Sequence, residues 1–155
     1  MRSALFALLL LFAPASWAQE ALPVATEEPA VAPQGLRILN AADVDPAEFL
    51  WQRRIVVVMA NSPQDPAFVQ QMRDIEAMPE DLDMRDVVVL VDSDRNSDSV
   101  VRRLLRPRGF MLAIIDKDGE IKQRRPAPRS VREIVAIIDR LPLRRQEVLD
   151  SNPGR

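Results

Sequence analysis

Oxygen-bearing side chains recur at every second position of the segment 92–98, which reads Asp-Ser-Asp-Arg-Asn-Ser-Asp. This spacing is typical of the first half of a calcium-binding loop, in which alternate residues offer oxygens to the ion. The rest of that motif is absent: the sixth position is Ser97 where the turn needs Gly, and the twelfth is Arg103 where a Glu should complete the shell. The segment is therefore either a loop that caps the next helix, which the departures favour, or a Ca²⁺ or Mg²⁺ site. The candidate metal ligands are Asp92, Asp94, Asn96 and Asp98.

The 155 residues include no Cys, no His and no Tyr. Without a thiolate the chain has no thiol-disulfide or cysteine peroxidase chemistry, and without imidazole it has no Ser-His-Asp triad. The serine best placed beside a helix start, Ser62, has no lysine near it in sequence to act as its base. We therefore expect no cofactor, and the sequence favours a non-enzyme.

Charge is distributed unevenly along the chain. Residues 19–98 carry a net charge of −10 and residues 99–155 a net charge of +7. Because the arginine guanidinium suits carboxylate and phosphate partners, we consider an anion-binding surface at Arg124, Arg125 and Arg129. The alternative is a solvated surface whose charges pair across the fold. Nucleic acid is not expected, since the chain lacks a basic stripe interleaved with aromatic residues.

The first 18 residues resemble a secretory signal peptide, with Arg2, an apolar run at 4–12, and small residues before a cleavage site between Ala18 and Gln19. The run is shorter than the ~20 residues of a membrane-spanning helix, and no later segment is apolar enough. We expect a periplasmic or secreted protein with no membrane span in the mature chain. The expected divisions are a signal peptide at 1–18, a Pro/Ala/Glu-rich flexible tether at 19–35, a folded domain at 36–148 and a disordered tail at 149–155.

Two apolar runs without alternation, 55–59 and 87–91, predict central strands that are covered on both faces. Asp65 and Pro66 begin a helix between them, so the two strands should be parallel. Its predicted apolar face comprises Phe68, Val69, Met72 and Ile75. A short helix is expected at 43–51, and its aromatic residues Phe49 and Trp51 are expected to pack in the core.

The second half of the chain predicts a helix, two strands and a closing helix. The helix after the 92–97 loop should turn Val100, Val101, Leu104 and Leu105 inward. A strand at 110–115 is joined by an Asp-Gly turn to an alternating edge strand at 120–124. A capping box from Ser130 to Glu133 opens the closing helix.

The order β-α-β-α-β-β-α resembles the thioredoxin fold, and the hairpin turn 117–120 is the most similar local piece. Together with the segment 141–147, which reads Leu-Pro-Leu-Arg-Arg-Gln-Glu, the stretch from about 50 to 148 resembles a family of exported bacterial proteins known as domain of unknown function 4174. The resemblance implies an α/β three-layer sandwich, with a mixed sheet of about four strands flanked by helices. It implies no established activity.

The positions that correspond to the thioredoxin redox motif carry no sulfur, and they are Pro63, Gln64, Asp65 and Pro66. The carboxylate of Asp65 can occupy the helix N-terminus that stabilises a thiolate in thioredoxins. The buried acid and the cis-proline of thioredoxins would fall near Val57 and Met111, which are both apolar. The resemblance thus implies the fold without its redox chemistry.

These observations favour a non-catalytic binding or interaction module, whose partner is an exported protein or a small anionic ligand. The alternative is a carboxylate-dependent Ca²⁺- or Mg²⁺-binding protein, or a hydrolase, that uses the loop from Asp92 to Asp98.

Overall fold

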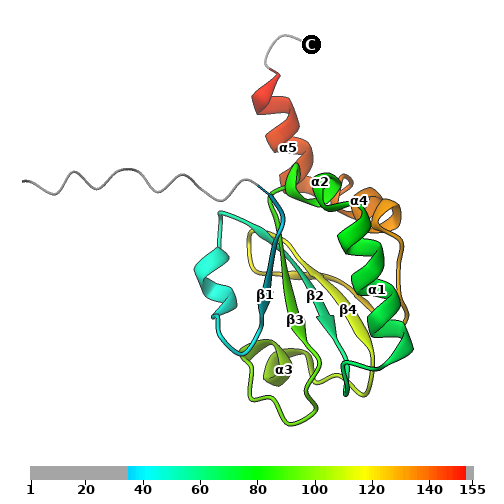
Figure 1. Cartoon of the computed structure of the whole chain (residues 1–155). Helices are drawn as coiled ribbons and strands as arrows, with labels where there is room; N and C mark the ends of the chain where they lie inside the picture. The colour runs from blue at the N-terminus through cyan, green and yellow to red at the C-terminus, as the bar shows by residue number, and fades with distance from the viewer. Residues whose placement is uncertain (1–34, 153–155) are drawn as a thin grey trace, which may run out of the picture. The chain divides into compact units, whose positions relative to one another are not determined.

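The computed structural model describes residues 35–152, so the predicted signal peptide, its cleavage site and nearly all of the tether lie outside the described residues. The described chain forms a five-stranded mixed sheet in the order β1-β3-β2-β4-β5 (Figure 1). The first three strands along the chain are parallel, and β4 and β5 run antiparallel to their neighbours. The strands are β1 Arg37–Asn40, β2 Arg54–Met59, β3 Val87–Asp92, β4 Met111–Ile115 and β5 Ile121–Arg125.

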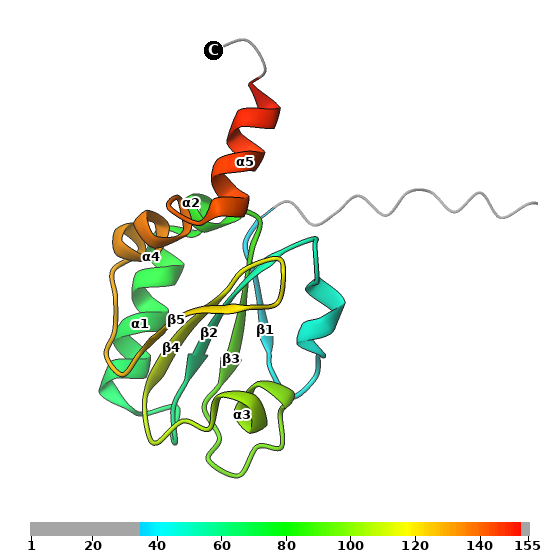
Figure 2. The ribbon, with the colours of Figure 1, turned by 180° about the vertical axis from the view of Figure 1, so that it is seen from behind.

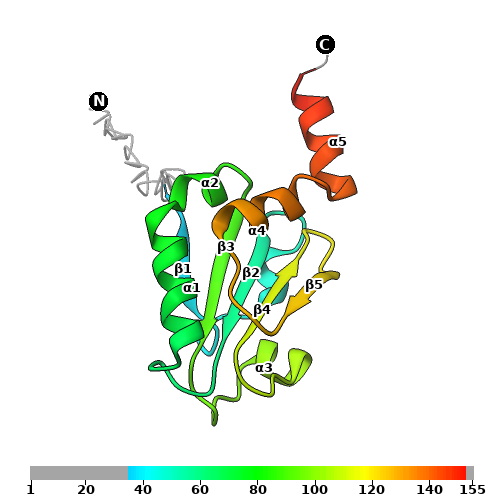
Figure 3. The same ribbon diagram turned by 90° about the vertical axis from the view of Figure 1, so that its right-hand side faces the viewer.

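The helices are placed by the caps that the sequence predicts. Asp65 accepts a hydrogen bond from the Ala67 N–H at 2.9 Å, and Ser130 and Glu133 form a capping box. The helical elements are the 3₁₀ turn η1 Pro46–Phe49, α1 Pro66–Ala77, α2 Pro79–Asp83, α3 Val100–Leu105, α4 Val131–Ile138 and α5 Pro142–Ser151. Helices α1 and α4 cover one face of the sheet, and η1 and α3 lie on the other (Figures 2 and 3).

Every residue of β2 is buried, as the run without alternation predicts. Successive side chains point to opposite faces, so Val56 and Val58 join the core beneath α1 and α4. Val57 and Met59 join the second core, beneath η1 and α3. The central strand β2 therefore contributes side chains to both cores, one on each face of the sheet.

The structure differs from the sequence predictions in the number of strands, in the added helices α2 and α5, and in the burial of several side chains. The sheet has five strands because the short segment β1 pairs with β3. Trp51 is 69% exposed, with a left-handed φ of 61°, so its predicted core packing is wrong, whereas Phe49 is buried. On α1, Val69 is exposed and Gln71 is buried instead, because its amide binds the backbone of Arg129.

Helix α5 stands out from the domain beyond the edge where β2 and β3 begin (Figures 1 and 3). It buries none of its residues and has no side-chain cap. It continues to Ser151, beyond residue 148 where the sequence places the end of the domain. Within residues 35–152, no helix is long and apolar enough to cross a membrane.

Candidate functional site

The loop 61–66, where thioredoxins carry their redox motif, is occupied by a structural cap. Asp65 Oδ1 accepts hydrogen bonds from the N–H groups of Ala67 and Phe68, at 2.9 and 3.4 Å. The hydroxyl of Ser62 donates to Gln64 Oε1. The first turn of α1 thus has its anionic acceptor already in place, and no side chain of this loop is presented as a nucleophile.

Asp92 ends β3 as a buried carboxylate and is held by helix α3. It accepts hydrogen bonds from the hydroxyl of Ser99 at 2.5 Å and from Arg102 Nη2 at 2.7 Å. Arg102 also donates to the carbonyl oxygen of Ala60 at 2.8 Å, which ties the ends of β2 and β3 together. Burial alone would raise the pKa of Asp92, but the bonds from Arg102 and Ser99 hold that pKa below its ordinary value.

Two of the other predicted metal ligands in this loop, Asp94 and Asp98, bind local partners, and Asn96 contributes its backbone N–H. Asp94 Oδ1 accepts from the N–H of Asn96 at 2.9 Å, and Asp98 pairs with Arg103 at 2.7 Å. No group of three or more Asp or Glu side chains within residues 35–152 is arranged to hold a metal ion. The contacts of these residues favour the capping interpretation of the loop.

The three arginines of the predicted anion-binding surface do not form one site. Arg129 has its backbone N–H bound by Gln71 at 2.8 Å, and its guanidinium pairs with Glu133 at 3.0 Å. Arg124 and Arg125 are adjacent on β5, where successive side chains point to opposite faces. Arg129 is therefore already engaged, and the two strand arginines face different surroundings.

Arg124 instead lines a basic groove with two arginines that follow helix α3. The groove has a volume of about 510 Å³, and its lining includes the segment that joins α3 to β4. We define the basic groove by Arg106, Arg108, Phe110, Met111 and Arg124. All three arginines are exposed, and within the described part of the chain none of them has a carboxylate within 4.0 Å. The groove thus offers unpaired positive charge above partly buried apolar side chains.

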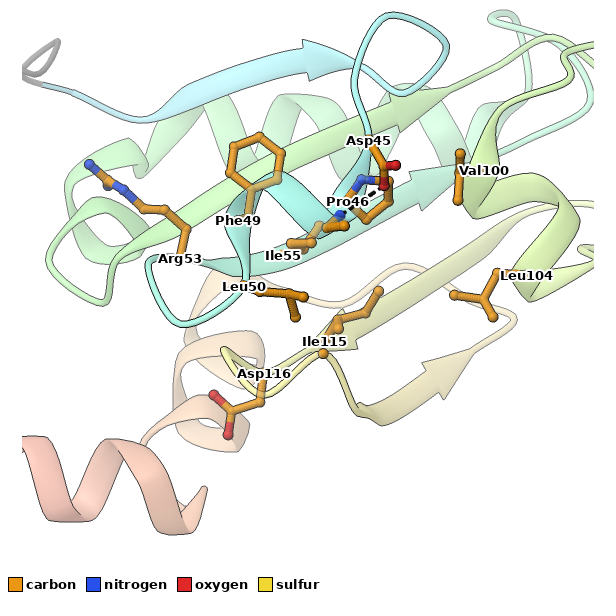
Figure 4. Close-up of a pocket in the computed structure, with 12 residues that line it drawn as sticks. Asp45, Pro46, Phe49, Leu50, Arg53, Ile55, Val100, Leu104, Ile115 and Asp116 are labelled. Carbon is orange, nitrogen blue, oxygen red and sulfur yellow. Dashed lines mark hydrogen bonds between the residues drawn. The ribbon is translucent and has the colours of Figure 1, made fainter.

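A second hollow, of about 230 Å³, lies on the face of the sheet that η1 and α3 leave partly uncovered (Figure 4). Leu50, Ile55 and Ile115 form its floor, and Val100 and Leu104 of α3 line its side. Those two α3 residues are therefore 36% and 52% exposed, although the sequence predicts them inward. Asp116 points its carboxylate away from the apolar side chains (Figure 4), so the polar side chains left at the rim are Asp45 and Arg53, and the hollow offers mainly apolar contact.

Gly119 allows the β4–β5 turn to close against the apolar hollow. Its φ is +80°, and a Cβ added there would lie 2.8 Å from Leu50 Cδ2. The Asp-Gly turn that the sequence predicts is thus required both by backbone conformation and by a side-chain neighbour.

At the end of the sheet where β2 begins, the structure buries a charged cluster. Arg54 has no exposed surface, and its Nε lies 2.9 Å from Asp116 Oδ1. Its Nη1 donates to the carbonyl oxygen of Arg85 at 3.1 Å, and its Nη2 donates to Glu147 of α5 at 3.0 Å. Glu147 also pairs with Lys117 at 2.9 Å. Helix α5 is therefore attached to the sheet by ion pairs rather than by an apolar face.

The cluster leaves hydrogen-bonding capacity unused. Asp116 Oδ2 and the Nε atoms of Arg54 and Arg144 are buried without a hydrogen-bond partner among the described residues. The 2.9 Å contact between Arg54 and Asp116 is thus an ion pair whose N–H is not directed at the oxygen. Such groups are costly when desolvated, so the cluster should be sensitive to the loss of any one member.

Replacing Glu147 with Gln should make the stability of the protein less dependent on pH. Burial alone would raise the pKa of Glu147, but Arg54 and Lys117 lower it from 4.5 to about 2. The carboxylate therefore stabilises the fold above its ordinary pKa of 4.5, and this contribution is lost as the pH falls toward 2. Urea unfolding should show E147Q less stable at neutral pH by about 1–3 kcal/mol, with the difference shrinking below pH 4.5.

The matched control for E147Q is Glu76→Gln, which changes an exposed glutamate on α1. Its stability should follow that of the unchanged protein from neutral to acid pH. Equal effects of the two substitutions would show that Glu147 does not hold α5 in the way its contacts indicate.

The charged cluster, from Arg54 to Glu147, lies within a segment that matches a known family. Residues 45–147 match the family described as "Domain of unknown function (DUF4174)". This chain belongs to the DUF4174 family. The match runs from η1 to Glu147, so the first half of α5 is part of the DUF4174 domain. The two segments on which the resemblance rests, 117–120 and 141–147, meet in space through Lys117 and Glu147.

Solved structures place the DUF4174 domain in the thioredoxin fold. It is similar to a reduced 2-Cys peroxiredoxin of Plasmodium vivax, with a TM-score of 0.55 and 13% identity over 68% of this chain and 85% of that one. It is also similar to a chloroplastic thioredoxin z, with a TM-score of 0.52 and 18% identity over 66% and 90% of the two chains. The predicted α/β, thioredoxin-like fold without cysteine is therefore confirmed.

Sequence reasoning missed Arg106, Arg108 and the Arg54 cluster. Arg106-Pro107-Arg108 is a visible pair of arginines, but only the fold brings it beside Arg124. Arg54 looks like a polar flank of the apolar run, and its partner Glu147 is 93 residues away. No local pattern could have joined these residues.

Proposed function

We propose that this protein is an exported, non-catalytic binding module that recognises an acidic peptide segment in the basic groove. The observation that carries the proposal is the set of three exposed arginines without carboxylate partners in the described chain. Guanidinium groups form charge-assisted bonds with carboxylates, and Phe110 and Met111 offer apolar contact between them. The leader-like residues 1–18 support export, and binding of this kind needs no cofactor.

The absence of cysteine supports binding in place of the thiol chemistry of thioredoxin-like proteins. The chain contains no cysteine, and the helix terminus that would stabilise a thiolate is capped by Asp65. The basic groove lies just before β4, near the position where the resemblance places the cis-proline of thioredoxins. We infer that this surface, near the position of the thioredoxin cis-proline, is available to a partner.

The probe for this proposal is a fluorescein-labelled hexaglutamate peptide, measured by fluorescence anisotropy with the mature chain. Replacing Arg106, Arg108 and Arg124 with Gln should weaken its binding by at least about tenfold, because charge-assisted hydrogen bonds are lost. Raising the salt concentration should weaken binding to the unchanged protein and affect the triple variant less.

The matched control replaces Arg73, Arg132 and Arg140, which are exposed elsewhere, with Gln. It changes the net charge by the same amount, and it should retain most of the peptide affinity. Equal losses in the two triple variants would mean that net charge and not the basic groove attracts the peptide, and the proposal would be rejected. No binding to the unchanged protein would also reject it.

A further inference from the structure

A third hollow lies at the base of α5, away from the basic groove. Its volume of about 500 Å³ falls within the ~300–1,000 Å³ of small-molecule sites in proteins. We call it the α5 hollow, and it is lined by Arg85, Asp139, Arg144, Arg145, Val148 and Leu149. Arg85 and Asp139 come from the rest of the domain, whereas both other arginines and both apolar side chains belong to α5, a helix that buries none of its residues.

The polar half of the α5 hollow has more positive than negative charge. Arg85 is fixed by two bonds of 2.8 Å to Asp139, which neutralise one guanidinium. Arg144 is held loosely, at 3.4 Å from Glu147, 3.3 Å from the Met84 carbonyl oxygen and 3.9 Å from Asp139. Its Nε has no hydrogen-bond partner among the described residues.

Arg145 adds a guanidinium that pairs with no carboxylate within residues 35–152. It is exposed, and it follows Arg144 directly on α5. Two arginines of the hollow therefore have capacity to bind an added anion, while the third is already satisfied by Asp139.

The apolar half of the α5 hollow consists of Val148 and Leu149, which are 45% and 68% exposed. Water contact with these side chains is unfavourable, and covering them releases free energy in proportion to the apolar area buried. A small inorganic anion would leave both uncovered. A neutral apolar molecule would leave the arginines unpaired.

We propose that the α5 hollow binds an anionic amphiphile, a carboxylate or phosphate that carries an apolar chain. The head group pairs with Arg144 and Arg145, and the chain lies on Val148 and Leu149. The ligand is taken as a single molecule from solution, because the hollow has the volume of a small-molecule site. This proposal is independent of the acidic-peptide function, since the two sites share no residue.

The test measures decanoate binding by titration calorimetry, with decanoate below its micellar concentration. Arg145→Gln and Leu149→Ser should each weaken binding by about tenfold, through a lost charged contact and lost apolar burial respectively. Both residues are exposed, so the variants should fold, which thermal unfolding checks. Arg132→Gln, an exposed change on α4 outside the hollow, is the matched control and should bind normally.

Two further probes separate the head group from the chain. Acetate and octyl glucoside should bind at least about tenfold more weakly than decanoate, because each satisfies only half of the hollow. Binding of acetate as tight as decanoate would reduce the site to a simple anion site and overturn the proposal. Binding to anionic phospholipid vesicles without decanoate binding would also overturn it, as would equal effects of Arg132→Gln and Arg145→Gln.

Discussion

Replacing Arg54 with Met should lower the free energy of unfolding by about 3–5 kcal/mol, the cost typical of removing one partner from a buried ion pair. Arg54 is fully buried at the start of β2, and its loss leaves the buried carboxylate of Asp116 without a cation. The Arg85 carbonyl oxygen loses its donor, and Glu147 of α5 keeps only Lys117 and Arg144. Urea denaturation at neutral pH measures the change.

The neighbouring arginine provides the matched control for this prediction. Arg53 is partly exposed and lies 3.6 Å from Asp83 at the surface, so Arg53→Met should cost no more than about 1 kcal/mol. The double variant Arg54→Met with Asp116→Leu removes both charges together, and it should recover much of the stability lost by Arg54→Met alone. Similar costs for Arg53→Met and Arg54→Met, or no recovery in the double variant, would contradict the role assigned to the cluster.

The sequence predicts those parts of the fold that depend on local chemistry. The strands β2 and β3 follow from apolar runs, and the starts of α1 and α4 follow from Asp65 and Ser130. The strand β1 is short and pairs at the edge of the sheet, so little in its own four residues distinguishes it from a loop. Elements with a strong internal period or cap are therefore predictable, and elements that depend on a distant neighbour are not.

In the candidate sites, too, local patterns are predictable from the sequence, whereas contacts between distant residues are not. The loop 92–98 has oxygens at the spacing of a metal site, and although its missing Gly and Glu favour a helix cap, the contacts of Asp92 with Arg102 and Ser99 depend on the fold. The basic groove needs Arg124 of β5 beside residues that follow α3, which the sequence pattern does not reveal. Trp51 is apolar enough for a core position, but the left-handed backbone at its position turns the chain and leaves the ring exposed.

Replacing Asp92 with Ala should lower the free energy of unfolding by about 3 kcal/mol, because Arg102 and Ser99 each lose a partner in a largely desolvated place. The loss should also loosen the ends of β2 and β3, since Arg102 joins Asp92 to the Ala60 carbonyl oxygen. Hydrogen exchange should therefore increase in α3 and in the segment 92–99. Because the pKa of Asp92 is lowered in the fold, this contribution is present above its ordinary value of 3.8 and is lost as the pH falls below it.

A substitution of the exposed neighbour Asp94 tests whether this loop has a structural role or binds a metal ion. Asp94→Asn changes a side chain that accepts one local backbone bond, so it should alter stability by no more than about 0.5 kcal/mol, with or without added Ca²⁺. If the loop bound Ca²⁺, the ion would raise the unfolding temperature of the unchanged protein, and both Asp92→Ala and Asp94→Asn would abolish that increase. A large cost for Asp92→Ala that is independent of Ca²⁺, beside a negligible cost for Asp94→Asn, is the result that the Asp92–Arg102 geometry requires. A Ca²⁺-dependent stabilisation lost in both variants would instead make the loop a metal site.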